Sequence, residues 1–258
     1  MIEPLAVFGR LARTSGSLVA LALISFAFSG CATTQVSYKT LNDAPQRIAA
    51  LKPQIAPLHV DVFELSAGGV SEKRDDWSQQ VTTHIAPILA EETGYRAAPI
   101  LTPEQKTAID GEMAEVVGML QIITLNHLTN LMGPAELQPQ GKPLTYNVGR
   151  IDKLLDSLGA DSLLVTFVRD EYSTGGRKAL MALGVLVSGV TGVYIVPRGG
   201  VTVNAAALVE RDGTVVWFNY AGSGGDMRTP EGARATAKLL LAGLPGDKGG
   251  AKSTTAVR

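Results

Sequence analysis

Cysteine is almost absent from this sequence, and its scarcity excludes a disulfide-stapled fold. Cys31 is the only cysteine in 258 residues, so no disulfide can form within the chain. The three histidines, His59, His84 and His127, have no second histidine or cysteine at metal-ligand spacing. The sequence therefore predicts no metal and no cofactor, and His84, near the apolar face of a predicted helix, is interpreted as structural.

The chain also lacks an excess of charge of one sign. It holds 23 Lys and Arg against 24 Asp and Glu, a formal net charge of -1. No basic stripe with interleaved aromatic residues occurs, so we expect no nucleic-acid partner.

Catalytic signatures are scarce as well. Ser223 in Gly222-Ser223-Gly224-Gly225 does not match the Gly-x-Ser-x-Gly nucleophile turn and is predicted to lie in a loop. The same glycines, with Arg228, would suit an anion at the start of the next helix, but the Lys-Ser/Thr pair of a phosphate loop is missing. We expect the protein not to be an enzyme.

The N-terminus has the pattern of a secretory signal. Arg10 and Arg13 precede an apolar run from Leu18 to Phe28, which is followed by Ser29-Gly30-Cys31. A basic region, a short apolar region and small residues before a cut site are typical of a signal peptide, here residues 1–30.

The ending Phe28-Ser29-Gly30-Cys31 resembles the lipobox of bacterial lipoproteins. The resemblance implies that Cys31 is acylated and becomes the mature N-terminus, which would attach the protein to a membrane through its lipid. Ala32 after the cysteine implies sorting to the outer membrane, with the domain on its periplasmic face.

The remaining chain divides into three parts by composition. Residues 31–57 are polar and proline-containing and are predicted to be a tether. Residues 58–244 are predicted to form one periplasmic domain, of ordinary size for a single core. Residues 245–258, small, polar and glycine-rich, are predicted to be a disordered tail.

Periodicity within the domain predicts an alternation of strands and helices. Strands are expected at 58–65, 95–101, 162–168, 201–210 and 215–220, and helices at 71–93, 102–131, 147–158 and 229–243. Arg211-Asp212-Gly213-Thr214 is predicted to be the turn of a hairpin.

The C-terminal half, from Leu155 to Leu244, carries a family resemblance. Gly159-Ala160-Asp161 before a buried strand, and the hairpin from Ala206 to Trp217, resemble the group that contains the TolB N-terminal domain and the curli-secretion lipoprotein. The resemblance implies an α+β fold, a mixed β-sheet of about 4–6 strands with helices packed over it, and a role as an envelope accessory or assembly factor.

One long apolar run interrupts this pattern. Ala179 to Val196 are eighteen residues without a charge, flanked by Arg177, Lys178 and Arg198. A single membrane crossing would separate strands expected in one sheet, so we predict an apolar helical insertion between two strands: a helix from about Arg177 to Val187, a turn, and an extended arm to Val196.

Two locations remain open for this insertion. The expected one is packing on the sheet. In the other, Arg177, Leu180, Leu183, Leu186 and Arg198 contact lipid or a partner, since flanking cations suit anionic headgroups. Burial of the leucines within the monomer would exclude the second location.

The sequence thus predicts a membrane-anchored periplasmic lipoprotein that acts as a non-catalytic accessory or assembly factor and binds another envelope protein. Two alternatives remain: a self-assembling subunit of a secretion channel, which would be a homo-oligomer, and a hydrolase of unknown substrate.

Overall fold

The structure is a computed structural model. The structure describes residues 36–99, 101–132, 146–222 and 224–245, all of which belong to one compact unit that begins at Gln35. The predicted signal peptide, Cys31, Ser223 and the tail from residue 246 lie outside the described residues.

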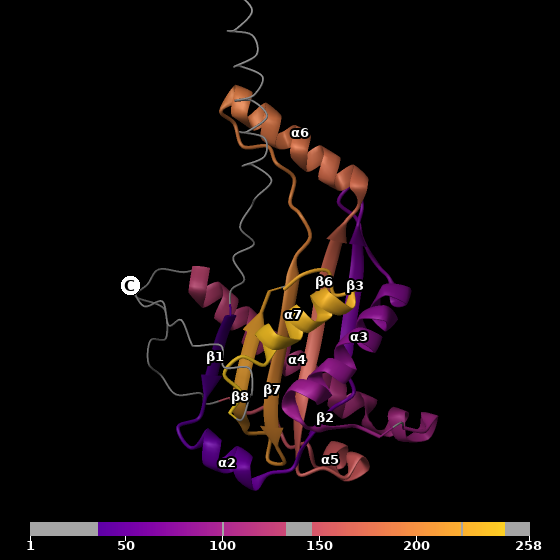
Figure 1. Cartoon of the computed structure of the whole chain (residues 1–258), viewed down its shortest axis with the longest axis vertical. Helices are drawn as coiled ribbons and strands as arrows, with labels where there is room; N and C mark the ends of the chain where they lie inside the picture. The colour runs from indigo at the N-terminus through magenta and orange to yellow at the C-terminus, as the bar shows by residue number, and fades with distance from the viewer. Residues whose placement is uncertain (1–35, 100, 133–145, 223, 246–258) are drawn as a thin grey trace, which may run out of the picture. The chain divides into compact units, whose positions relative to one another are not determined.

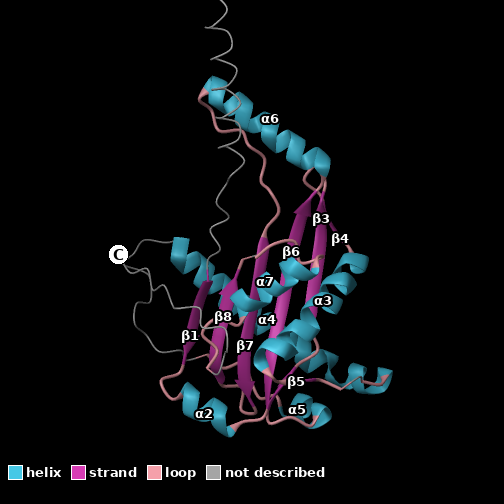
Figure 2. Ribbon diagram, in the orientation of Figure 1, coloured by secondary structure: helices cyan, strands magenta, loops and turns pink. Residues whose placement is uncertain are grey.

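A mixed sheet forms the centre of this unit (Figure 2). Its order is β1-β8-β7-β6-β2-β5, and β3 pairs with both β6 and β4. The eight strands of the described residues are β1 (Val36–Thr40), β2 (Pro53–Ile55), β3 (His59–Leu65), β4 (Ser71–Lys73), β5 (Arg96–Ala97), β6 (Ser162–Ser173), β7 (Thr202–Glu210) and β8 (Val215–Ala221).

The strand β6 organises the sheet because it has twelve residues and pairs on both sides. Its first residues pair in parallel with β2, and His59 to Leu65 of β3 pair in parallel with Phe167 to Ser173. On its other side β6 runs antiparallel to β7. The turn from β7 to β8 contains Gly213 at φ 84°, a conformation that favours glycine.

Helices cover both faces of the sheet. The covering helices are α2 (Ala44–Ala50), α3 (Asp75–Thr93), α4 (Pro103–Met132), α5 (Asp152–Leu158) and α7 (Pro230–Leu240). A further helix, α6 (Gly175–Thr191), follows β6 and packs on neither face. Side chains alternate across a strand, so Leu164 and Val168 of β6 pack with α2, α3 and α7, whereas Leu163 and Val165 pack with α4 and α5. The expected α+β class is confirmed, as is a helical insertion between two strands, α6 between β6 and β7.

The predicted tether is wrong in its extent. Residues 36–55 form β1, α2 and β2, and β1 pairs along its whole length with β8. Ala44 and Ile48 of α2 are buried in the core beside α3 and α7. The apolar pattern of this stretch is short because backbone pairing holds it in place, β1 with β8 and β2 with β6 and β5, together with a few buried apolar side chains, Ala44, Ile48 and Ile55.

Candidate functional site

The candidate site is the α6 projection, which we define as residues 175–200: α6 and the arm that returns to β7. Figure 1 shows α6 beyond the ends of β3 and β6, with no other helix of the described residues beside it. The helix begins after Thr174, whose side chain accepts a hydrogen bond from the Arg177 backbone at 3.2 Å, an N-cap that satisfies a free amide of the first turn. It ends at Gly192, at φ 72°.

The helix packs against its own arm. Gly184 allows this contact, because a Cβ atom there would lie 3.0 Å from Val196 Cα and 3.1 Å from Pro197 Cδ. Farther along, the hydroxyl of Ser188 accepts a hydrogen bond from the Ile195 amide at 3.0 Å. Helix and arm therefore form one hairpin-like unit with internal contacts.

Hydrogen bonds also fix the base of the projection to the sheet. The guanidinium of Arg177 donates to the carbonyl of Arg198 at 2.9 and 2.7 Å and to that of Ala67 at 3.2 Å. Arg198 in turn pairs with the buried carboxylate of Glu171 at 3.3 Å. Of the predicted contact residues, Arg177 and Arg198 are thus brought together, and both position the projection.

The expectation that this segment packs on the sheet is wrong. Leu180, Leu183, Val185 and Leu186 are 41%, 54%, 47% and 58% exposed, and Gly184 is the one buried residue of α6. On a helix, positions three and four apart share a face, so Leu183, Leu186 and Val190 form an apolar stripe opposite the arm. The predicted contact leucines stand on the surface of the monomer.

A second apolar surface lies on α4. Met119, Ile122 and Leu125 are 37%, 62% and 62% exposed and recur at a spacing of three residues. We call them the outer face of α4. The inner face of the same helix is buried in the core, through Val116, Leu120 and others.

The histidines have structural surroundings. His127 is buried, stacks on Phe218 and Tyr220 with ring centroids 5.5 and 5.9 Å apart, and lies 3.2 Å from the Tyr146 hydroxyl. His84 contacts the Met227 carbonyl at 3.5 Å, and His59 lies 3.0 Å from Asp61. Within the described residues, no group of three or more His, Cys, Asp or Glu side chains is placed to hold a metal ion.

Arg228, considered above for an anion, already has a carboxylate partner. It makes two hydrogen bonds to Asp226, at 2.9 and 2.8 Å, which lower the pKa of the Asp226 carboxyl. Its guanidinium also lies over the rings of Tyr172 and Trp77, at 3.9 and 4.4 Å from their centroids. These contacts give Arg228 a structural role, because they connect the loop before α7 to α3.

Sequence reasoning missed a polar pair on β6, the buried Asp170 and the partly buried Tyr172. Asp170, 2% exposed, accepts a hydrogen bond from the Thr202 hydroxyl, and Tyr172 accepts one from the Met227 amide at 3.1 Å. Burial raises the pKa of the Asp170 carboxyl. Burial is the largest cause that raises the pKa of the Tyr172 phenol, and the neighbouring Asp170 raises this pKa further.

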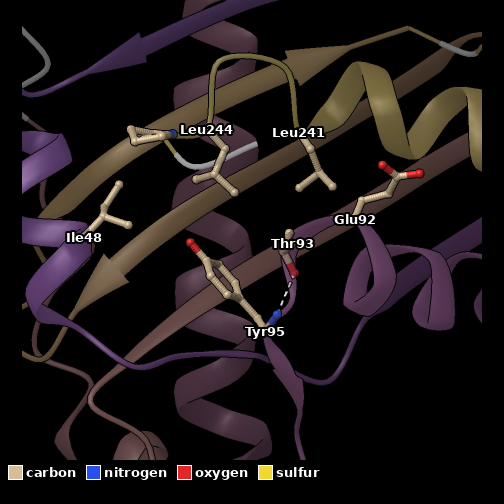
Figure 3. Close-up of a pocket in the computed structure, with 7 residues that line it drawn as sticks. Ile48, Glu92, Thr93, Tyr95, Leu241 and Leu244 are labelled. Carbon is tan, nitrogen blue, oxygen red and sulfur yellow. Dashed lines mark hydrogen bonds between the residues drawn. The ribbon is translucent and has the colours of Figure 1, made fainter. Parts of the chain in front are cut away.

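A small pocket lies between α2, the end of α3 and the end of α7. Its volume is about 150 Å³, below the roughly 300 Å³ of the smallest typical ligand sites. Figure 3 shows the Tyr95 hydroxyl directed toward the space between Ile48 and Leu244. Burial raises the pKa of this phenol, and Glu92 at the rim pairs with Arg234 at 3.2 Å.

Comparisons with known proteins give only a loose likeness. No family model and no curated protein matches. A PelC dodecamer from Paraburkholderia phytofirmans matches at 13% identity and a TM-score of 0.35, over 81% of this chain and 95% of that one. A DUF4136 family protein from Bacteroides thetaiotaomicron matches at 9% identity and a TM-score of 0.25, over 81% and 91%. The resemblance is loose and at the level of fold, and no function follows from it.

Among the helices in the described ranges, none combines the length and the hydropathy needed to cross a bilayer.

Replacing Gly184 should loosen the projection without unfolding the domain. In Gly184→Leu the side chain would overlap Val196 and Pro197, and overpacking costs about 1–3 kcal/mol. We expect chymotrypsin to cleave after Tyr194 roughly an order of magnitude faster, because local opening becomes more frequent. Gly189→Leu is the matched control, since nothing lies within 4 Å of a Cβ atom there. Equal cleavage of both variants would contradict the packing of α6 on its arm.

Asp170 should make the stability of the fold depend on pH. The pKa of Asp170 is raised in the folded protein, so this carboxyl ionises at lower pH in the unfolded chain than in the folded one. The stability that it contributes is fully present at low pH. It is lost as the pH rises from about 4, the pKa in the unfolded chain, through the pKa in the folded protein. Asp170→Asn keeps an acceptor for Thr202 and removes the titration. Urea unfolding at several pH values should show the wild type losing stability relative to the variant, and parallel profiles would refute the assignment.

Proposed function

We propose that this protein is a lipid-anchored, non-catalytic accessory or assembly factor of the cell envelope. One observation carries the proposal: the α6 projection presents an exposed apolar stripe, Leu183, Leu186 and Val190, on a helix held in a defined position. Large exposed apolar patches mark sites of contact with proteins or membranes. The protein, on this proposal, acts by binding.

The contacts at the base support this role. The two hydrogen bonds from the Arg177 guanidinium to the Arg198 carbonyl and the contact of Gly184 with the arm hold the stripe in one position, as a binding surface requires. Burial of apolar surface stabilises by roughly 25 cal/mol for each Å². Contact of the exposed stripe with a molecule outside the monomer would gain this free energy.

The anchor is proposed from the sequence. The lipobox-like Phe28-Ser29-Gly30-Cys31 and the absence of any other cysteine fit acylation of Cys31 and a location on the periplasmic face of the outer membrane. Stable attachment needs two acyl chains or more, and a lipidated N-terminal cysteine provides them.

The outer face of α4 is the proposed contact for another envelope protein. A photo-crosslinking amino acid at Ile122, 62% exposed, tests it in cells, with Lys106 on the same helix as the matched control because it is exposed and polar. We expect Ile122 to capture one specific envelope protein, Lys106 to capture none, and the crosslink to be lost in Cys31→Ser.

Other outcomes would overturn the proposal. Crosslinks between copies of this chain alone would favour the self-assembling subunit of a secretion channel. Hydrolysis of a substrate by the purified protein, lost in His84→Ala, would favour a hydrolase.

A further inference from the structure

We propose that the occupant of the apolar stripe is an anionic phospholipid surface: α6 lies in the interface of the membrane that holds the lipid of Cys31. The inference rests on the proposed function for the acylation of Cys31. It is carried by the strand register, the length of chain between Cys31 and the sheet, and the charges at the base of the projection.

The register places the start of the sheet and the projection at the same end. Val36, the first residue of β1, pairs with Ala221 of β8, which pairs with Asn204 of β7, and Asn204 pairs with Val168 of β6. The projection leaves β6 after Ser173 and rejoins β7 at Thr202. Neighbouring strands lie about 4.8 Å apart, so Val36 is about 14 Å across the sheet from the strand that leads into α6.

The chain before Val36 is too short to place the acylated residue at the other end. Four residues lie between Cys31 and Val36, and the five steps of an extended chain at most about 3.6 Å each span about 18 Å. Val36 is level with Asn204, so the other end of β7, at Glu210, lies about 20 Å away along the strand, whereas Thr202, where the projection rejoins β7, lies about 7 Å away. Chain length alone therefore keeps a lipid on Cys31 within reach of the end of the sheet where the projection rejoins β7 and short of the other end.

The charges of the projection complement an anionic surface. Residues 175–200 contain Arg177, Lys178 and Arg198 and no Asp or Glu. Glu171, the acid that Arg198 contacts, also pairs with Arg169 at 3.3 Å, so one carboxylate serves two guanidinium groups. Each basic residue near an anionic membrane surface contributes about 1 kcal/mol of attraction.

The geometry of the helix indicates a shallow position in the membrane. The stripe of Leu183, Leu186 and Val190 faces away from the arm, so it can enter the boundary of headgroups and acyl chains, about 5–10 Å deep, while the arm backbone stays hydrated. Burial of the arm in hydrocarbon would cost several kcal/mol for each unpaired backbone group. Tyr194, 82% exposed beside the helix end, belongs to a residue type that is enriched at this level.

A probe on the stripe tests the inference in the full lipidated protein. Acylation consumes the Cys31 thiol, so Leu186→Cys would supply a single thiol for an environment-sensitive fluorophore. Ser157→Cys on α5 is the matched control, since it is exposed and α5 leads into the start of β6, at the opposite end of the sheet. Each protein is reconstituted into vesicles of phosphatidylethanolamine and phosphatidylglycerol that carry nitroxide-labelled lipid.

We expect the probe at position 186 to shift to shorter wavelength and to lose most of its fluorescence to the nitroxide, and the probe at 157 to change little. Quenching should weaken in phosphatidylcholine vesicles and in a Lys178→Glu background. Lys178 is exposed and forms no ion pair within the described part of the chain, so this change should leave the fold intact.

Two results would overturn the inference and leave the proposed function standing. One is an unquenched probe at 186 on membrane-bound protein. The other is a wavelength shift that depends on protein density and not on nitroxide lipid, which would indicate a second copy on the stripe. Failure of the proposed anchor looks different: the thiol of Cys31 would be labelled in the wild-type protein, and the protein would not stay on vesicles.

Discussion

Wild-type protein should incorporate labelled fatty acid in bacterial cells, and the Cys31→Ser protein should incorporate none. Cys31 carries the only thiol of the chain, so no other residue can take over a thioether-linked lipid. Each buried methylene contributes about 0.8 kcal/mol, and two or more chains make attachment effectively permanent. Mass spectrometry of the mature N-terminus should find the acyl chains on Cys31 and residues 1–30 removed.

A second form of the protein separates anchoring from signal-peptide retention. Cys31→Ser would also block removal of a lipoprotein signal, so its apolar run could keep the chain on the inner membrane. Replacing residues 1–31 with an ordinary secretory signal should give a domain that high salt releases from membranes, because the few apolar side chains of the stripe bind weakly once the electrostatic attraction of the cationic base is screened. Salt-resistant attachment of that form would contradict Cys31 as the main anchor.

The elements of the C-terminal half follow well from the sequence because their side-chain patterns are local. The strands before and after the Asp212-Gly213 turn and the helix that Thr229 caps are found where predicted. The stretch 36–55 was missed because β1 is held by pairing with β8, which lies about 180 residues later in the chain. No local periodicity encodes such a partner.

The position of the projection was missed for a related reason. The strand was predicted to end at Val168. Arg169, Asp170 and Glu171 follow it, and three charged residues in succession are more typical of an exposed loop than of a buried strand. In the structure β6 continues to Ser173, because Thr202 pairs with Asp170 and two arginines pair with Glu171. Five further residues carry the chain about 17 Å along the strand, so α6 begins beyond the reach of the helices that cover the sheet.

Composition alone could not separate a buried apolar helix from an exposed one, and a matched pair of substitutions should do so experimentally. Leu164 is 0% exposed in the core between β6 and the helices α3 and α7, whereas Leu186 is 58% exposed on α6. Leu164→Ala should lower the free energy of unfolding by about 2–5 kcal/mol, through lost burial and the cavity left behind. Leu186→Ala should change it by no more than about 0.5 kcal/mol, since leucine and alanine both favour helix.

Urea denaturation of the two variants beside the wild type measures the difference, and both variants make the same chemical change. A large loss in Leu186→Ala would mean that α6 packs within the monomer after all, and the proposed function would lose the observation that carries it. The expected contrast would instead show that the fold gains little from Leu186. Reduced membrane association of Leu186→Glu, with the stability of the domain unchanged, would then assign the stripe to contacts outside the monomer.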